Sequence, residues 1–263
     1  MLIALLVVAG GLGVGLVLGL TGAGGGILAV PALVFIQGWS VAEAAPIGLL
    51  AVTGAALVGT VEGFYLKLVR YRAACLMALV GVPMTPLGLA VAQRLSAAWL
   101  AGIFGLTMLV VATRLLMSAG ERDEQQVPCH INLQTGRLHW TAKTVAIMTA
   151  LGAVTGFLTG LLGVGGGFIL VPTLRKFTDI SMHGIVATSL MVIALVGSGS
   201  IMVALWQEHD FPLSVALPFI GATAIGMVGG RLLIKRFNSR TVQRLFALLV
   251  LGVAGLMFYR AFS

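Results

Sequence analysis

The chain has 263 residues, of which 59% are hydrophobic and only 9% are charged, and its mean hydropathy is +1.08. In a soluble domain about a quarter of the residues are charged, because its surface must be solvated. This composition therefore excludes a soluble globular protein. The net charge of +8 does not indicate nucleic-acid binding, because Lys and Arg stand in short segments between apolar stretches, as in membrane-protein loops.

The apolar stretches are long enough to cross a bilayer. No charged residue precedes Glu43, and further charge-free runs cover 73–93, 95–113, 180–207 and 211–230. A helix needs about 20 apolar residues to span the hydrocarbon core, and in lipid only helices or closed barrels satisfy their backbone hydrogen bonds. Because the runs lack the alternation of barrel strands, we predict an all-α polytopic membrane protein with roughly eight to ten membrane segments of this length.

The chain contains an internal repeat. Residues 19–33 read GLTGAGGGILAVPAL, residues 160–174 read GLLGVGGGFILVPTL, and nine of the fifteen aligned positions are identical. Three further apolar segments follow each copy. The repeat predicts two homologous halves, a first transmembrane repeat over 1–118 and a second over 142–263, joined by a polar cytoplasmic linker over 119–141.

Loop charges predict how the two halves are oriented. The loop 66–72 carries three basic residues and is expected to be cytoplasmic, whereas the loop 207–210 has no Lys or Arg and is expected to face outward. Equivalent loops then lie on opposite sides, as in inverted-topology repeats. Parallel repeats remain the alternative, because Arg94 lies in the loop 93–96.

Each half begins with an apolar stretch that its glycine motif interrupts. Residues 1–37 would extend about 55 Å as one helix, which exceeds a single crossing. The chain is expected to turn at the glycines, which adopt positive φ and weaken helices. The turn makes either a re-entrant hairpin or a crossing followed by a half-helix. In the alternative interpretation the glycines only allow close helix packing.

The functional interpretation places a substrate site between the two glycine breaks. Helix N-termini bind anions through free N–H groups and the helix dipole, and interrupted segments at matching positions of two halves are typical of transport sites. The predicted substrate-binding residues are Thr21, Gly22, Gly24, Gly25, Gly26, Gly163, Gly165, Gly166, Gly167, Thr188 and Ser189. Each hydroxyl has the simpler alternative of bonding a carbonyl of its own helix.

A few ionisable residues lie near the apolar segments. Glu62 and His183 stand close to the expected segment ends, where an interfacial position is the simpler interpretation. A proton-coupling role for Glu62 is the alternative hypothesis. Arg94 and Arg231 either steer anions at the entrances or anchor their helices at the interface.

No catalytic or metal-binding pattern is found. The chain has no HExxH motif, and GAGGG and GVGGG lack both the lysine and the preceding strand of a nucleotide loop. Cys75 and Cys129 lack metal-ligand spacing. We therefore predict a protein that is not an enzyme and that holds no cofactor or metal.

The doubled motif resembles the TauE/SafE family of membrane transporters, named for sulfite export. Residues 187–190 (Ala-Thr-Ser-Leu) and the glycine-spaced stretch 221–231 support the resemblance, which covers both halves but not the linker. It implies a multi-pass secondary transporter that exports sulfite, organosulfonates or related small anions across the bacterial inner membrane. The first half has Ala45-Pro46-Ile47 where the second has the hydroxyl pair, so the hydroxyl role is expected for the second half alone.

The expected partners are a small anionic substrate, the lipid bilayer and a coupling H⁺ or Na⁺. An oligomer is compatible with the sequence, and nucleic acid is not expected as a partner. Within transport, the alternative is a transporter or channel for another small organic anion, such as a carboxylate. From a different class, the chain would be an accessory membrane subunit with no transport of its own. Transport by the purified protein in liposomes discriminates between these hypotheses.

Overall fold

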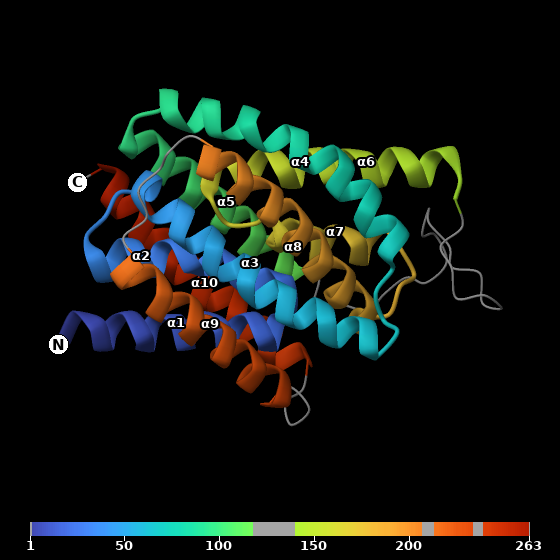
Figure 1. The fold of residues 1–263 in the computed structure, drawn as a ribbon, viewed down its shortest axis with the longest axis horizontal. Helices are drawn as coiled ribbons and strands as arrows, with labels where there is room; N and C mark the ends of the chain where they lie inside the picture. The colour runs from blue at the N-terminus through green and yellow to red at the C-terminus, as the bar shows by residue number, and fades with distance from the viewer. Residues whose placement is uncertain (1, 118–139, 207–212, 234–238, 263) are drawn as a thin grey trace.

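The computed structural model describes residues 2–117, 140–206, 213–233 and 239–262, and these residues form a helical bundle (Figure 1). Most of the predicted linker 119–141 and the whole of the loop 207–210 lie outside the described residues. The elements in chain order are α1 (Leu2–Thr21), η1 (Gly22–Leu28), α2 (Ala29–Gln37), α3 (Val41–Tyr65), α4 (Tyr71–Arg94), α5 (Ala97–Met117), α6 (Ala142–Leu162), α7 (Gly167–Phe177), α8 (Met182–Trp206), α9 (Leu213–Leu233) and α10 (Ser239–Phe262).

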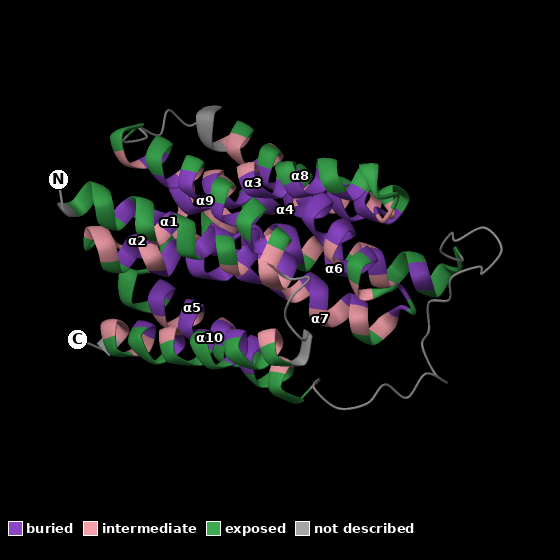
Figure 2. Cartoon of the chain, turned by 90° about the horizontal axis from the view of Figure 1, so that it is seen from below, coloured by how far each residue is buried: buried purple, intermediate pink, exposed green. Residues whose placement is uncertain are grey.

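Eight of these helices are long and apolar enough to cross a membrane, namely α1, α3, α4, α5, α6, α8, α9 and α10. The other two α-helices are short, with 9 residues in α2 and 11 in α7. Large apolar side chains such as Leu79, Leu217 and Leu248 are exposed on the outside of the bundle, as expected for surfaces that face lipid (Figure 2). The prediction of an all-α multi-pass membrane protein is therefore confirmed, with eight candidate spans in the described residues.

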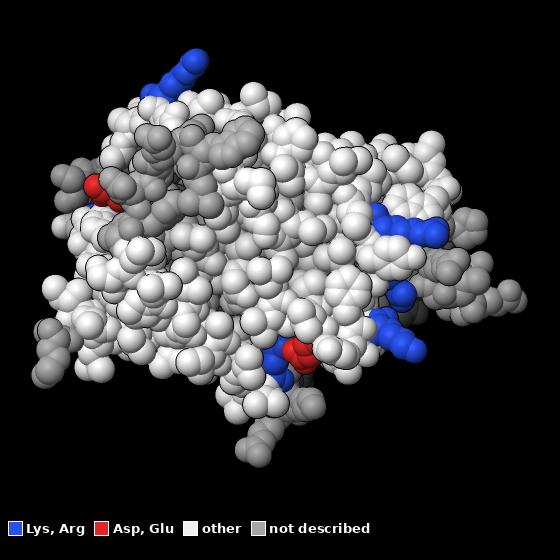
Figure 3. All heavy atoms as spheres, in the orientation of Figure 1, with Lys and Arg blue, Asp and Glu red and all other residues white. Residues whose placement is uncertain are grey.

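The long helices lie roughly parallel to the long axis, and both termini are at the same end of the molecule (Figure 1). In that view α1 and α3 run away from the end that holds the termini, whereas α6 and α8 run toward it. The face of the molecule drawn in Figure 3 is mostly uncharged, and several Lys and Arg side chains lie at the end opposite the termini, with others at the edges of the view.

The two halves interlock through helix pairs. The helix α1 of the first half packs along α9 of the second, and α6 of the second packs along α4 of the first. Both pairs depend on glycine: a Cβ on Gly19 would meet the carbonyl oxygen of Met227, and a Cβ on Gly160 would meet that of Thr85. Close helix packing through small residues is common in membranes, and it accounts for these glycines.

Not every glycine outside the two motifs allows a close helix contact. Gly88 lies against the α6 backbone at Phe157, whereas nothing lies within 4 Å of a Cβ built on Gly229 in the described part of the chain.

The boundary between α2 and α3 follows from local chemistry. Gly38 adopts φ +74° at the end of α2, a left-handed conformation that favours glycine. Ser40 then caps α3: its hydroxyl accepts the Glu43 N–H at 3.3 Å, and its own N–H donates to the Glu43 carboxylate at 2.7 Å. This capping box places the first charged residue of the chain at a helix end.

Candidate functional site

The second glycine motif has an irregular backbone between two helices. The helix α6 ends at Leu162 and α7 begins at Gly167, and Gly163, Gly165 and Gly166 adopt φ of +67°, +72° and +59°. Residues with a side chain rarely adopt these angles. The N–H groups of Gly167 and Phe168 precede the first hydrogen bond of α7, because an α-helix offers no acceptor to its first N–H groups.

The first glycine motif has a different backbone. Gly22 adopts φ +74°, and the chain then continues as the 3₁₀-helix η1 directly into α2. In a 3₁₀-helix each N–H donates to the carbonyl three residues earlier. From about Gly25 onward the N–H groups of this copy are therefore used within the helix.

The structure brings the two motifs together. A Cβ on Gly26 would lie 3.4 Å from the carbonyl oxygen of Val164, which belongs to the second motif. The side chain of Val52 on α3 faces both copies, because its Cγ1 lies 2.9 Å from a Cβ on Gly26 and 3.6 Å from one on Gly165. Residues 138 positions apart in the sequence, 26 and 164, thus meet in the buried interior.

Three buried hydroxyls have no hydrogen-bond partner among the described residues. They belong to Thr53, Thr155 and Ser189, whose residues are 2%, 0% and 0% exposed. A buried polar group without a partner costs about 1–3 kcal/mol, and such groups call for an explanation because most buried polar atoms are bonded.

These hydroxyl residues belong to the helices around the motifs. Thr155 of α6 lies against the start of α7, because a Cβ on Gly166 would be 2.6 Å from its Cγ2 and 2.7 Å from its carbonyl oxygen. Thr53 follows Val52 on α3, and its hydroxyl faces Gly197 of α8, where a Cβ would meet it. Ser189 stands one helical turn before Ile193 of α8, and the Ile193 Cγ2 is 2.9 Å from a Cβ on Gly165.

The hydroxyls that the sequence predicted have different roles. The Thr21 hydroxyl donates to the Val17 carbonyl at 2.7 Å, which is the simpler alternative. The Thr188 hydroxyl accepts the Arg70 N–H at 3.0 Å and so holds the loop between α3 and α4. Only Ser189 of the three is unpaired.

The sequence analysis missed Thr155. Its neighbour Thr159 is a threonine in the same helix, and the Thr159 hydroxyl donates to the Thr155 carbonyl at 2.7 Å. Nothing in the sequence separates these two residues. The contact of Thr155 with Gly166 is the feature that does so, and it exists only in the folded chain.

The predicted glycines of the two motifs also differ in what they contact. A Cβ on Gly25 would lie 2.5 Å from the Cα of Leu18, so Gly25 allows η1 to pack on α1. Gly22 lies against the side chain of Val186, and Gly24 lies against the ring of Phe246, 3.2 Å from its Cε1. Among these first-copy residues, Gly26 is the one that contacts the second motif.

The buried polar side chains of the described residues are uncharged. Every fully buried polar side chain among the described residues is Ser or Thr. The last turn of α7 holds Arg175 and Lys176, and Arg260 of α10 donates to the Val34 and Gly38 carbonyls at the end of α2, at 2.9 and 2.8 Å. Cations at these C-terminal ends offset the negative ends of the two dipoles.

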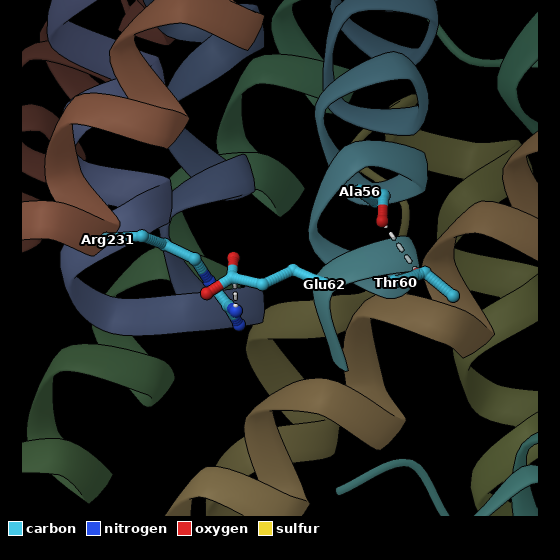
Figure 4. Close-up of polar contacts among 4 residues, drawn as sticks. All are labelled: Ala56, Thr60, Glu62 and Arg231. Atoms are coloured by element: carbon cyan, nitrogen blue, oxygen red, sulfur yellow. Dashed lines mark hydrogen bonds and ion pairs between the residues drawn. The ribbon is translucent and has the colours of Figure 1, made fainter. Parts of the chain in front are cut away.

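Glu62 and Arg231 form an ion pair between the two halves (Figure 4). The Arg231 Nη1 lies 2.8 Å from the Glu62 Oε2, and the side chains are 15% and 47% exposed, respectively. The sequence analysis treated the two residues separately. The pair joins α3 to α9, and it has no counterpart between α8 and α4, because α8 contains no Asp, Glu, Lys or Arg. The nearby Thr60 hydroxyl donates to the Ala56 carbonyl at 2.7 Å.

Comparisons with known proteins agree with this architecture. The family model described as "Sulfite exporter TauE/SafE" matches residues 7–257. A "probable membrane transporter protein" of Xylella fastidiosa (strain 9a5c) is 32% identical over 259 residues, 97% of this chain and 94% of the relative. The "probable membrane transporter protein YunE" of Bacillus subtilis (strain 168) is 27% identical over 208 residues, 74% of this chain and 76% of the relative.

A third relative, named a probable membrane transporter protein in Methanocaldococcus jannaschii, is 24% identical over 279 aligned positions, 97% of this chain and 95% of the relative. No solved structure matches the chain significantly. These names describe membrane transporters and not enzymes. Because the family model spans nearly the whole chain and includes both glycine motifs, the chain belongs to the sulfite exporter TauE/SafE family of membrane transporters.

Proposed function

We propose that the protein is a secondary transporter that exports sulfite, organosulfonates or related small sulfur-containing anions by alternating access. The substrate site lies between the two glycine motifs. The observation that carries the proposal is the meeting of Gly26 and Val164, with the unpaired buried hydroxyls of Thr155 and Ser189 on the helices that contact Gly166 and Gly165. The family description supports the choice of sulfite and chemically similar anions.

The chemistry of this region suits a weakly basic oxyanion. The first N–H groups of α7, at Gly167 and Phe168, supply donors at the positive end of a helix dipole. The hydroxyls of Thr53, Thr155 and Ser189 add donors that have no hydrogen-bond partner among the described residues. Such neutral donors replace the water around a sulfite or sulfonate group without the cost of burying a charged side chain in the membrane.

Alternating access requires two related halves around the site. The proposal includes inverted-topology repeats with the predicted boundaries 1–118 and 142–263, and the opposite directions of α1 and α6 support it (Figure 1). The end of the molecule with Lys67, Arg70 and the last turn of α7 is the cytoplasmic end, by the positive-inside rule. The membrane is the bacterial inner membrane, and H⁺ or Na⁺ drives transport.

Uptake of labelled sulfite and methanesulfonate into proteoliposomes tests the proposal. We expect saturable uptake by the wild type, and a KM raised about two- to tenfold in Thr155→Val and in Ser189→Ala, since one lost hydrogen bond contributes about 0.5–1.5 kcal/mol. Thr223→Val is the matched control, because the Thr223 hydroxyl already donates to the Phe219 carbonyl at 2.7 Å.

Each outcome of this assay has a distinct meaning. Equal KM values in all variants would show that these hydroxyls do not bind the substrate. Efficient competition by acetate but not by methanesulfonate would indicate a carboxylate carrier. Failure of the wild type to transport any small anion under any imposed gradient would favour the accessory-subunit hypothesis.

A further inference from the structure

The last helix of the chain, α10, is bonded to the carboxyl ends of both short helices. At the end of α2, the Arg260 Nη1 donates to the Val34 carbonyl at 2.9 Å, and its Nη2 donates to the Gly38 carbonyl at 2.8 Å. At the end of α7, the Arg175 Nη1 donates to the Oε1 of Gln243, near the start of α10, at 3.1 Å. One helix therefore contacts the ends of the two short helices that follow the glycine motifs.

The helix α10 is itself held by α5, which lies beside it at one edge of the bundle (Figure 2). The Gln243 Nε2 donates to the Leu115 carbonyl in the last turn of α5 at 2.8 Å. Closer to the other end of the pair, a Cβ on Gly105 would lie 3.3 Å from the Phe258 ring. Both polar groups of the Gln243 amide are used, one toward α7 and one toward α5, and this fixes how the side chain is oriented.

The contacts with α2 and α7 lie near opposite ends of α10. From Gln243 to Arg260 the helix extends roughly 25 Å at 1.5 Å per residue. Between them, the Phe246 ring lies 3.2 Å from a Cβ built on Gly24 of η1. The helix α10 thus holds the outer ends of α2 and α7, while the inner ends of the two short helices adjoin the place where the glycine motifs meet.

The short helices depend on such contacts for their position. With 9 and 11 residues, α2 and α7 are too short to cross the membrane, so what they contact at their ends decides where they point. The last carbonyls of a helix have no N–H donor within it. In α2 the Arg260 guanidinium supplies donors there, and its charge lies where the helix dipole favours a cation.

We propose that Arg260 and Gln243 are positioning residues for the transported anion, which hold the outer ends of α2 and α7 so that the two glycine motifs keep the spacing that binds it. The inference rests on the proposed function, and neither residue touches the substrate. Loss of either set of bonds lowers the fraction of molecules in the binding arrangement, and the apparent affinity falls with that fraction. The saturated rate changes little, because bound substrate itself favours that arrangement.

Uptake of methanesulfonate by the full chain in proteoliposomes tests this inference. KM, Vmax and the melting temperature are measured for the wild type, Arg260→Gln, Arg260→Lys and Gln243→Leu. We expect Arg260→Gln and Gln243→Leu to raise KM about three- to tenfold, the scale of one or two lost hydrogen bonds, with little change in Vmax. Arg260→Lys keeps the charge at the end of α2 but lacks the planar fork, so its KM is expected to be intermediate.

Two matched variants separate positioning from general effects. Arg244→Gln removes an exposed positive charge next to Gln243 and is expected to keep the wild-type KM. Thr141→Ala removes the cap of α6, where the Thr141 hydroxyl accepts the Thr144 N–H at 3.2 Å. It is expected to lower the melting temperature without raising KM.

An unchanged KM with a lower melting temperature in Arg260→Gln or in Gln243→Leu would overturn the inference, because those bonds would then only stabilise the fold. An equal rise of KM in Thr141→Ala would overturn it as well. Both results would leave the proposed function intact, whereas a wild type that transports no anion would overturn both. If Arg260→Gln does not fold, Arg260→Lys and Gln243→Leu decide the outcome by the same criteria.

Discussion

The two glycine motifs share their pattern and differ in their backbone. The first copy forms the 3₁₀-helix η1 with one left-handed glycine, whereas the second has three left-handed glycines and no regular structure between α6 and α7. The variable position of the motif holds Ala23 in the first copy and the β-branched Val164 in the second, and alanine favours a helix more than valine does.

This difference gives the two copies unequal parts in the proposed site. In the first copy the helix uses its own N–H groups, whereas in the second the N–H groups of Gly167 and Phe168 remain available. Thr155 also lies against the second copy, at Gly166. The second motif is thus expected to provide most of the anion binding. The first motif is expected to pack η1 against α1, α3 and the second motif.

The largest effect is expected from a side chain in the second motif. Gly166 has φ +59°, and a Cβ there would meet Thr155 at 2.6 Å, so Gly166→Ala is expected to destabilise the fold by about 1–3 kcal/mol and to abolish saturable uptake. Gly26→Ala is the matched variant in the first copy, where φ is not positive and the Cβ meets the Val52 side chain at 2.9 Å. Thermal unfolding in detergent and uptake are measured for both, and equal losses would contradict the unequal roles.

Effects of intermediate size are expected at Thr188 and Ser189, whose neighbouring hydroxyls are predicted to have different roles. Thr188→Val removes the acceptor of the Arg70 N–H and is expected to lower the free energy of unfolding by about 1 kcal/mol. Ser189→Ala removes an unpaired hydroxyl and is expected to raise KM without lowering the melting temperature. A Ser189→Ala protein that melts earlier but keeps its KM would show that both hydroxyls are structural.

The smallest effect is expected at the ion pair of α3 and α9. Because the Glu62 carboxylate is half-exposed and paired with Arg231, Glu62→Gln is expected to change uptake less than about fivefold, the range of an exposed ion pair. We also expect the pH dependence of uptake to persist, which an assay between acidic and alkaline buffers measures. Loss of that dependence in Glu62→Gln, but not in Arg231→Gln, would support the proton-coupling hypothesis instead.

Much of the architecture was predictable because it depends on local composition. Long charge-free runs predicted the membrane helices, since in lipid each segment must satisfy its own backbone hydrogen bonds. The repeat at 19–33 and 160–174 predicted two related halves, and the doubled motif also indicated the family that the comparisons confirm.

The roles of individual polar residues could not be predicted in the same way. The sequence analysis grouped Thr188 with Ser189, treated Glu62 and Arg231 separately and did not single out Thr155. Whether a hydroxyl is bonded depends on what the neighbouring helix places beside it, as the Arg70 N–H does for Thr188. The contacts of Arg70 with Thr188 and of Glu62 with Arg231 join residues that are 118 and 169 positions apart in the chain.

The sequence by itself therefore determined which segments are long and apolar enough to cross a membrane, because hydrophobicity is a property of single residues and short segments. The tertiary structure alone decided that Gly26 meets Val164, that Thr155 lies at the start of α7 and that Arg260 bonds the carbonyls at the end of α2. These features depend on how the helices pack on one another, which hydrophobicity and residue type do not specify.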